Sequence, residues 1–451
     1  MRKFLFFILI VPFYLFSQDN DKHESWQLDG ASDRIEKYRK GDLILNFNID
    51  KSIKNKTGKL KLKLKNHDFK FGVSFTQLRR FWGTKYADKY LQQVKRVFNY
   101  ATVGMYWALT DERNKSGKME KFYDDVLFWA DKNNIRIKGH PLMWHEAMPD
   151  WIRSYKNLDE LDMLIKNHMK RLIETYPQIN DWDVYNEPIG PFKPHIPPSS
   201  IRDWINYKGG IYPAMVEIYN YVNSVSSSKN YSNNHYHAKD PEFFKINKFF
   251  IDQGLNYSSI GMQAHMQSED NVMSEEQLWN QIEDYAILGK NIQFTEITVT
   301  SSKRFKNWKD HQVFLKKRDS IIKNGGEYDL PSLPSFEDFQ SDYLKDFYTL
   351  AFSHPSVSSI TIWNLTDQNA WRGHAGGVLF KDLTEKKSFL TLENLIKNRW
   401  STKITKELNL NNEFSFRGFY GLYECELDID GKVHKFEFNF NKEDKVVMID
   451  I

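Results

Sequence analysis

The stretch Asp181-Trp182-Asp183-Val184-Tyr185-Asn186-Glu187-Pro188 is an apolar and aromatic segment that ends in a single carboxylate. Its valine and aromatic residues favour a buried strand, and Pro188 prevents that strand from continuing. Glu187 is therefore expected at the carboxyl end of the strand. In a parallel α/β barrel, the loops that follow the strands build the active site at that end.

A second stretch of the same kind is Asn291-Ile292-Gln293-Phe294-Thr295-Glu296-Ile297-Thr298-Val299, with one acid near its end. The separation from Glu187 leaves room for two or three strand–helix units of ~30 residues each. Two carboxylates that face each other are what hydrolysis of a glycosidic bond needs, because one protonates the leaving oxygen and the other attacks the anomeric carbon. The alternative is that each glutamate ends a strand in water, where glutamate is usually found.

Strand-like and helix-like segments alternate around these two stretches. The predicted strands cover residues 69–75, 101–107, 135–144, 182–187, 259–266, 292–299 and 358–365, with a poorly marked fifth strand before residue 259. Helical patterns cover residues 86–98, 121–133, 158–176 and 275–288. Such alternation indicates a parallel sheet. We therefore expect an α/β fold, a (β/α)8 TIM barrel over residues 69–402.

The fifth strand is the weak point of this pattern. Residues 226–240 are dense in Ser, Asn, Tyr and His, which is typical of a long surface loop or of a degraded strand. His235 and His237 could bind a metal ion, but no third ligand stands at a suitable spacing, so we interpret them as solvated.

Both ends of the chain carry strands with a period of two. Residues 59–65 alternate lysine with leucine, and similar patterns occur at residues 43–49, 414–416, 420–427 and 435–440. One charged side is typical of antiparallel strands with a solvated face. We expect residues 18–68 and 403–451 to form a small accessory β region with a structural role; a sugar-binding module is the alternative. The lysines we interpret as protection of a sheet edge.

Composition narrows the class of function. The 451 residues carry 63 Lys and Arg against 59 Asp and Glu, and the net charge of +4 is spread along the chain, which argues against a nucleic-acid partner. Aromatic residues make up 15% of the chain, and tryptophan and tyrosine rings are suited to stack on sugars. We expect a monomer with no membrane span.

The N-terminus predicts export. Met1-Arg2-Lys3 precedes an apolar run of residues 4–16, and Ser17 offers a small residue before cleavage, so residues 1–17 are interpreted as a signal peptide of a secreted or periplasmic protein. The run is too short to span a bilayer, although a membrane-anchoring helix is the alternative. Cys425 is the single cysteine, so no disulfide forms within the chain.

Three more segments place polar or aromatic residues at predicted strand ends: Gly139-His140-Pro141-Leu142-Met143-Trp144-His145, Gly261-Met262-Gln263-Ala264-His265 and residues 360–372. Together with the two glutamate stretches, they resemble the hallmark segments of glycoside hydrolase family 10, the retaining endo-β-1,4-xylanases. The order of the five segments also fits, from residue 69 to about residue 400. Residues 34–42 and 67–72 are similar to the lead-in of members with an extra N-terminal β region.

The resemblance implies that Glu187 is the general acid/base and Glu296 the nucleophile. It also implies that His265 holds Glu296 by a hydrogen bond and that Gln263 contacts Glu187. A general acid must keep its proton near neutral pH, so the pKa of Glu187 should be raised, whereas the nucleophile must stay ionised.

The other substrate-binding residues that the resemblance implies are His140, Trp144, Asn186, Trp363 and Trp371. Asn186 and His140 would bind sugar hydroxyls at the cleavage point, where hydrogen bonds tighten in the transition state. Trp363 and Trp371 would form an aromatic floor and wall, and Trp144 would support the strand ends. The alternative for the tryptophans is core packing.

One segment departs from the family. Xylanases of this family usually carry Glu-Asn and a nearby Lys after strand two, which grip the next sugar, but residues 101–107 read Ala-Thr-Val-Gly-Met-Tyr-Trp. Loss of such hydrogen bonds costs a few kcal/mol on a buried sugar, so unmodified xylan is expected to be a poor substrate. Met105 and Tyr106 would suit a substituted or different β-linked sugar.

The sequence therefore predicts a secreted retaining glycoside hydrolase that cleaves internal bonds of a xylan-like polysaccharide. An exo-acting or differently specific β-glycosidase, acting for example on an algal polysaccharide, is one alternative. A non-catalytic carbohydrate-binding barrel is another. No cofactor is implied, because two carboxylates and water suffice, and no residues have metal-ligand spacing.

Overall fold

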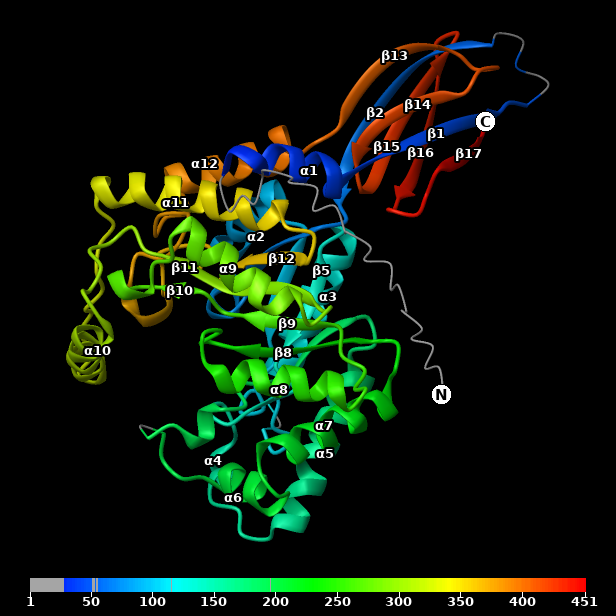
Figure 1. The fold of residues 1–451 in the computed structure, drawn as a ribbon. Coiled ribbons are helices and arrows are strands. Elements are labelled where there is room, and N and C mark those ends of the chain that lie inside the picture. The colour runs from blue at the N-terminus through cyan, green and yellow to red at the C-terminus, as the bar shows by residue number, and fades with distance from the viewer. Residues whose placement is uncertain (1–27, 51–52, 54–55, 115, 195) are drawn as a thin grey trace, which may run out of the picture.

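The computed structural model describes residues 28–50, 53, 56–114, 116–194 and 196–451, so the predicted signal peptide lies outside the described residues. Eight parallel strands pair in a closed ring, which confirms the predicted barrel (Figure 1). In ring order these strands are β3 (Lys70–Ser74), β4 (Tyr100–Gly104), β5 (Arg136–His140), β7 (Asp181–Asn186), β8 (Asn230–His235), β9 (Ser259–Met262), β11 (Asn291–Val299) and β12 (Val357–Ile362).

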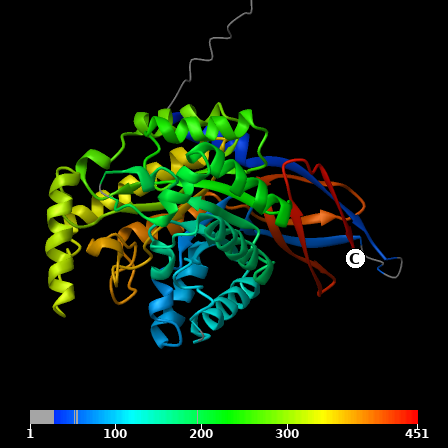
Figure 2. The ribbon, with the colours of Figure 1, turned by 90° about the horizontal axis from the view of Figure 1, so that it is seen from below.

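Helices surround the ring and cover its outer face (Figure 2). The helices of the described residues are α1 (Ala31–Arg39), α2 (Lys85–Val97), α3 (Lys118–Lys132), α4 (Asp150–Arg153), α5 (Leu158–Thr175), α6 (Ser200–Tyr207), α7 (Ile211–Val225), α8 (Pro241–Asp252), α9 (Glu275–Ala286), α10 (Trp308–Lys323), α11 (Pro334–Ser353) and α12 (Lys387–Asn394). Of these, α10 stands apart from the ring on one side of the molecule (Figure 1). No helix among the described residues is long and apolar enough to cross a membrane.

Two predicted strands are each divided in two. β5 is followed by the short β6 (Met143–Trp144), and β9 is followed by β10 (His265–Met266). Between β9 and β10 the chain turns at Ala264, whose φ of 62° lies in the left-handed region that a non-glycine residue rarely adopts. The break leaves the residues at the strand end free to turn toward the barrel mouth instead of extending the ladder.

The fifth strand is β8, and it is buried along almost its whole length. The surface-loop alternative is therefore wrong, and His235, which is fully buried, is not solvated. Two polar residues of β8, Ser232 and Asn234, have side-chain partners inside the barrel: the Ser232 hydroxyl donates a hydrogen bond of 2.5 Å to Asp183 Oδ1, and the Asn234 amide donates to Glu296. The ring nitrogens of His235, by contrast, have no hydrogen-bond partner among the described residues. A strand whose polar side chains are satisfied by neighbouring strands does not show the apolar pattern by which strands are predicted.

A buried ion pair lies inside the barrel. Lys138 Nζ of β5 is 2.6 Å from Asp183 Oδ1 of β7, and it also donates to Gln293 Oε1 of β11 at 2.9 Å. Burial alone would raise the pKa of Asp183, but the positive charge of Lys138 and a hydrogen bond from His140 lower it to about 2. The pair thus links three strands across the ring and fixes the strand ends that carry the site.

The accessory β region is formed by strands from both ends of the chain, as expected, and projects to one side of the barrel (Figure 1). One sheet has the order β14-β1-β17 and the other the order β13-β2-β15-β16. The strands are β1 (Lys40–Asn48), β2 (Thr57–His67), β13 (Lys403–Asn409), β14 (Phe414–Phe419), β15 (Gly421–Ile429), β16 (Lys432–Phe440) and β17 (Val446–Asp450). Rings from the two sheets pack edge to face between them, as Phe416 does against Tyr423 and Phe440.

The lysines of β2 do not protect a sheet edge, and that interpretation is wrong. β2 is an inner strand, paired with β13 on one side and with β15 on the other. Its lysines face solvent and meet acids of neighbouring strands: Lys63 is 3.1 Å from Glu424, and Lys65 is 2.5 Å from Glu437. The charged face is a layer of cross-strand ion pairs, whereas the leucines between the lysines point into the core.

We predict that Lys138→Met lowers the free energy of unfolding by ~3–5 kcal/mol at neutral pH, because it leaves the Asp183 carboxylate buried without its ion partner. The pKa of Asp183 is lowered in the folded state, so the pair stabilises the protein above about pH 4 and loses that contribution as the pH falls toward 2. Urea denaturation should show that the difference in the free energy of unfolding between wild type and variant becomes smaller as the pH is lowered from about 4 toward 2.

The matched control is Lys248→Met on α8, because Lys248 pairs with Asp252 on the exposed surface. Such a pair contributes ~0–1 kcal/mol, so this variant should unfold almost as the wild type does. Equal stability of Lys138→Met and Lys248→Met would show that the Lys138 pair does not stabilise the barrel.

Candidate active site

The two predicted carboxylates lie at the carboxyl ends of the ring strands. Glu187 follows β7 directly, and Glu296 lies within β11; both side chains are buried, with 8% and 5% exposure. Glu187 has a φ of 60°, and its peptide N–H donates to the Asn234 carbonyl at 2.9 Å. The backbone thus leaves the extended conformation at Glu187 because β7 ends there, and it is held in the unusual conformation by the neighbouring strand.

Glu187 accepts two hydrogen bonds from side chains. Gln263 Nε2 donates to Oε1 at 2.7 Å, and Trp144 Nε1 donates to Oε2 at 3.2 Å. The pKa of Glu187 is nevertheless raised to about 7, first by burial and then by the negative charges of Glu296 and Glu146, which together outweigh the two hydrogen bonds. At neutral pH a large fraction of this carboxyl group therefore carries a proton.

Glu296 is surrounded by nitrogen atoms. Asn234 Nδ2 donates to Oε1 at 2.9 Å, and His265 Nε2 donates to Oε2 at 3.2 Å. The Thr298 hydroxyl lies 3.0 Å from His265 Nδ1 and can donate to it, which fixes the tautomer that leaves the Nε2 proton for Glu296. His140 Nε2 lies 3.9 Å from Oε1. Both oxygens of the Glu296 carboxyl group are thus held by side-chain hydrogen bonds.

Asn234 is a site residue that the sequence interpretation missed. Its amide nitrogen donates to Asn186 Oδ1 and to Glu296 Oε1, each at 2.9 Å, and its Oδ1 accepts from the Thr295 hydroxyl at 2.7 Å. A β-carbon at Gly261 would lie 2.5 Å from Asn234 Oδ1, so the neighbouring strand needs glycine there. A signal existed in the run Ser232-Asn233-Asn234-His235, whose polar residues continue directly to a predicted strand end.

His140 is oriented by the ion pair inside the barrel. Its Nδ1–H donates to Asp183 Oδ2 at 2.8 Å, which turns Nε2 toward Glu296. Asp183 thereby contacts Lys138 through one oxygen and His140 through the other. A histidine held in this way keeps one orientation while it contacts a ligand with the other nitrogen.

Aromatic rings line the same region. Trp363 packs against His140 and His265 with ring centroids 5.8 and 6.2 Å apart, and the Trp371 ring lies 4.2 Å from that of His265. Trp363 is buried and Trp371 is half-buried. On the other side, the Tyr106 ring lies 5.7 Å from the rings of both His140 and Trp144.

The structure thus brings the predicted site residues together by direct contacts. The nine are Glu187, Glu296, His140, Trp144, Asn186, Gln263, His265, Trp363 and Trp371. Their roles in a reaction remain predictions; the site holds one carboxyl group with a raised pKa, Glu187, and a second, Glu296, that accepts two side-chain hydrogen bonds.

Three groups at this site could also hold a metal ion. His145, Glu146 and Glu187 each offer one ligand atom, and these atoms lie within 4.8 Å of one another. Both ring nitrogens of His145 are buried, and neither has a hydrogen-bond partner among the described residues. This grouping could not be predicted from spacing, because Glu187 is far from the other two residues along the chain.

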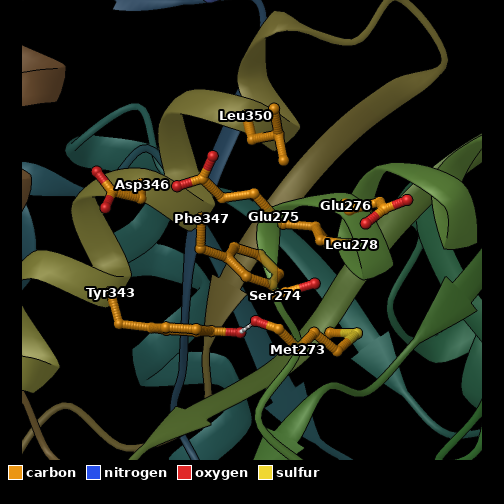
Figure 3. Close-up of a pocket in the computed structure, with 9 residues that line it drawn as sticks. All are labelled: Met273, Ser274, Glu275, Glu276, Leu278, Tyr343, Asp346, Phe347 and Leu350. Carbon is orange, nitrogen blue, oxygen red and sulfur yellow. Dashed lines mark hydrogen bonds between the residues drawn. The ribbon is translucent and has the colours of Figure 1, made fainter. Parts of the chain in front are cut away.

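A pocket of about 480 Å³ lies away from these residues, between helices α9 and α11 (Figure 3). Tyr343 and Phe347 form part of its wall, and Glu275 and Asp346 lie at its rim. None of the nine predicted site residues lines it. Its lining residues belong to α9, to α11 and to the segment before α9, in the helical layer outside the ring.

Comparison with known proteins agrees with the geometry. The sequence model described as Glycosyl hydrolase family 10 matches residues 59–394. Endo-1,4-beta-xylanase B of Thermotoga neapolitana is 23% identical over 346 residues, which cover 72% of this chain and 89% of that protein. Anti-sigma-I factor RsgI6 of Acetivibrio thermocellus is 24% identical over 433 residues, 92% of this chain, although the match spans only 48% of that longer protein.

The fold is also shared with solved structures. Native xylanase 10B from Thermotoga maritima superposes with a TM-score of 0.57 at 18% sequence identity, covering 74% of this chain and 96% of that chain. Xylanase XynB from Paenibacillus barcinonensis gives a TM-score of 0.54 at 19% identity, over 72% of this chain and 95% of that chain. These structures share the barrel, and the family match extends over most of this chain, so the chain belongs to glycosyl hydrolase family 10.

Proposed function

We propose that this protein is a secreted, monomeric, retaining glycoside hydrolase that cleaves internal β-glycosidic bonds of a xylan-like polysaccharide. The observation that carries the proposal is the contrast between two neighbouring buried carboxyl groups. Glu187 has a pKa raised to about 7, whereas Glu296 accepts hydrogen bonds from Asn234 and His265. Retaining hydrolysis needs this division into an acid and a nucleophile.

In the first step, the Glu296 carboxylate attacks the anomeric carbon while Glu187 gives its proton to the leaving oxygen. In the second step, Glu187 takes a proton from water as that water attacks the same carbon, and Glu296 is released unchanged. His265 and Asn234 hold the two Glu296 oxygens, so the attacking atom is oriented before substrate arrives. The export prediction rests on residues 1–17 of the sequence.

Substrate contacts follow from the same geometry. His140 Nε2 and the Asn186 side chain lie beside Glu296 and Asn234, where they can reach sugar hydroxyls at the cleavage point. Trp363 and Trp371 offer flat apolar faces next to these polar groups. Sugar-binding sites combine such faces with a few placed hydrogen-bonding groups.

A changed specificity is the second candidate. The segment after β4 carries Met105 and Tyr106 where related xylanases place charged and amide groups, and the Tyr106 ring packs on His140 and Trp144 at the edge of the site. A site that lacks these hydrogen-bonding groups suits a substituted or different β-linked sugar.

Glu296→Ala should abolish hydrolysis of xylan and of an aryl β-xyloside alike, because both reactions need the nucleophile. Glu187→Ala should slow xylan hydrolysis on the order of 10²–10⁴-fold, with a smaller loss on the aryl substrate, whose leaving group needs no proton. Proton NMR of the wild-type reaction should show the β-anomer first. Glu174→Ala, which removes an exposed acid of α5, is the control with unchanged activity. Full activity in either active-site variant, or an α-anomer as first product, would refute the assignment.

The pH dependence of kcat/KM should report the protonation state of Glu187. Because the acid must be protonated, kcat/KM should fall as the pH rises through about 7. Gln263 donates to the ionised form of Glu187, so Gln263→Leu should raise the pKa and move the alkaline limb upward by on the order of one pH unit. If the alkaline limb of the pH profile is unchanged in Gln263→Leu, a group other than Glu187 determines that limb.

A further inference from the structure

His145 is a buried histidine whose ring nitrogens are not accounted for by hydrogen bonds. Its side chain is 3% exposed, and both nitrogens lack a hydrogen-bond partner among the described residues. The ring is held nearly parallel to that of Tyr185, with the planes 13° and the centroids 6.4 Å apart. Buried polar groups are paired in the great majority of cases, so a fixed imidazole of this kind is expected to contact an ion or a water molecule.

Two neighbouring strands bring His145 beside Glu187. β6 runs parallel to β7, with Trp144 level with Asn186. The next residues, His145 and Glu187, therefore leave the two strands side by side. The turn after Glu187 is closed by a hydrogen bond of 2.8 Å from the Gly190 N–H to the Glu187 carbonyl. A β-carbon at Gly190 would lie 2.6 Å from His145 Nε2, so glycine leaves the room that this edge of the ring needs.

Glu146 completes a group of three ligand atoms. Its Oε1 lies 3.9 Å from His145 Nε2, and one atom from each of His145, Glu146 and Glu187 lies within 4.8 Å of the other two. Ligands at ~2.1 Å from a tetrahedral zinc ion are ~3.4 Å apart, so the group must contract by roughly 1 Å to hold such an ion. Because the Glu146 side chain is 45% exposed, it can swing toward an ion that the two buried groups hold.

The ligand types select a transition-metal dication. One imidazole nitrogen and two carboxylate oxygens suit Zn²⁺ and the ions next to it in the series, whereas Mg²⁺ and Ca²⁺ prefer oxygen ligands alone. Three protein ligands leave a fourth position for water. In permanent zinc sites the second ring nitrogen of the histidine donates to a carbonyl or carboxylate oxygen, but Nδ1 of His145 has no such acceptor among the described residues. We therefore expect reversible binding.

We propose that His145, Glu146 and Glu187 bind a transition-metal dication such as Zn²⁺, and that the bound ion reversibly inhibits hydrolysis. The inhibition rests on the proposed function, because the ion occupies the carboxyl group assigned as the acid/base. A carboxyl group that coordinates a metal ion has released its proton to solvent, so it cannot protonate the leaving oxygen. Binding of the ion does not depend on that assignment.

Isothermal titration of Zn²⁺ into protein without a histidine tag tests the site. The wild type should bind one ion with an affinity that Glu146→Gln lowers on the order of tenfold or more, because loss of even an outer partner of a metal ligand has an effect of this size. His145→Gln should lower the affinity at least as much. Circular dichroism of both variants checks that they are folded, and the exposed position of Glu146 makes its variant the safer of the two.

Glu283→Gln is the matched control. Glu283 also lies beside a buried histidine, with Oε1 at 3.2 Å from His354 Nε2 and a side chain that is 51% exposed. Among the described residues, however, this pair belongs to no group of three ligands. The affinity of Glu283→Gln for Zn²⁺ should equal that of the wild type. Equal affinities of the wild type, Glu146→Gln and His145→Gln would overturn the site.

Inhibition is measured as the initial rate on xylan with Zn²⁺, relative to the rate of the same protein in excess EDTA. Zn²⁺ should inhibit the wild type and Glu283→Gln equally, and EDTA should restore both rates. The Zn²⁺ concentration that halves the rate should rise on the order of tenfold in Glu146→Gln. Mg²⁺ at the same concentration should leave the wild-type rate unchanged.

The two measurements separate this inference from the proposed function. Zn²⁺ binding that Glu146→Gln weakens, without inhibition of the wild type, would support the metal site and overturn both the inhibition and the assignment of Glu187 as the acid/base. Equal inhibition of the wild type and Glu146→Gln would overturn the inference, while the assignment of Glu187 would stand.

Discussion

The site depends on the hydrogen bonds of one buried amide. Asn234 accepts the peptide N–H of Glu187 with its carbonyl, and donates its side-chain amide to Asn186 and to Glu296. The ends of β7, β8 and β11 are therefore fixed relative to one another by a single residue. Because a parallel ladder bonds the strands evenly along their length, it does not by itself orient the side chains at their ends. The amide supplies that orientation.

Much of this architecture could be predicted from the sequence, and the part that could not has a physical reason. Strands such as β7 and β11 can be predicted from their apolar and aromatic residues, and an acid near the end of each indicates the face of the barrel where the site is built. β8 is not recognisable as a strand in the sequence, because its residues Ser232 and Asn234 are polar. Their partners lie on other strands and are brought close only when the ring closes. For the same reason the sequence analysis did not predict Asn234 as a site residue, although it predicted Glu187, Gln263 and His265. The lysines of β2 were misinterpreted because the partner strands that flank them come from the far end of the chain.

The molecule separates the two carboxyl groups from the groups proposed to select the substrate. The carboxyl groups and their hydrogen-bond partners lie on β6 to β11 or in the turn after β9, whereas Met105 and Tyr106 follow β4. Tyr106 meets the first set through ring contacts with His140 and Trp144. Loops on this face of a barrel can change without disturbing the strands that carry the reacting groups, which is one reason why the fold hosts many specificities.

The interleaving of the two chain ends in the accessory region sets the order in which the protein can fold. β2 is made early, but β13 and β15, its partners, follow the whole barrel in the sequence, so β2 waits through most of chain synthesis with both of its edges open. During that time Leu60, Leu62 and Leu64 have no sheet to cover them, and a bare strand of this kind is prone to self-association. The alternating lysines place a positive charge beside every leucine and keep such strands apart by mutual repulsion. In the finished protein Lys63 and Lys65 pair with glutamates. In a chain whose later strands are not yet in place, we expect the same lysines to oppose association of the unpaired strand with others.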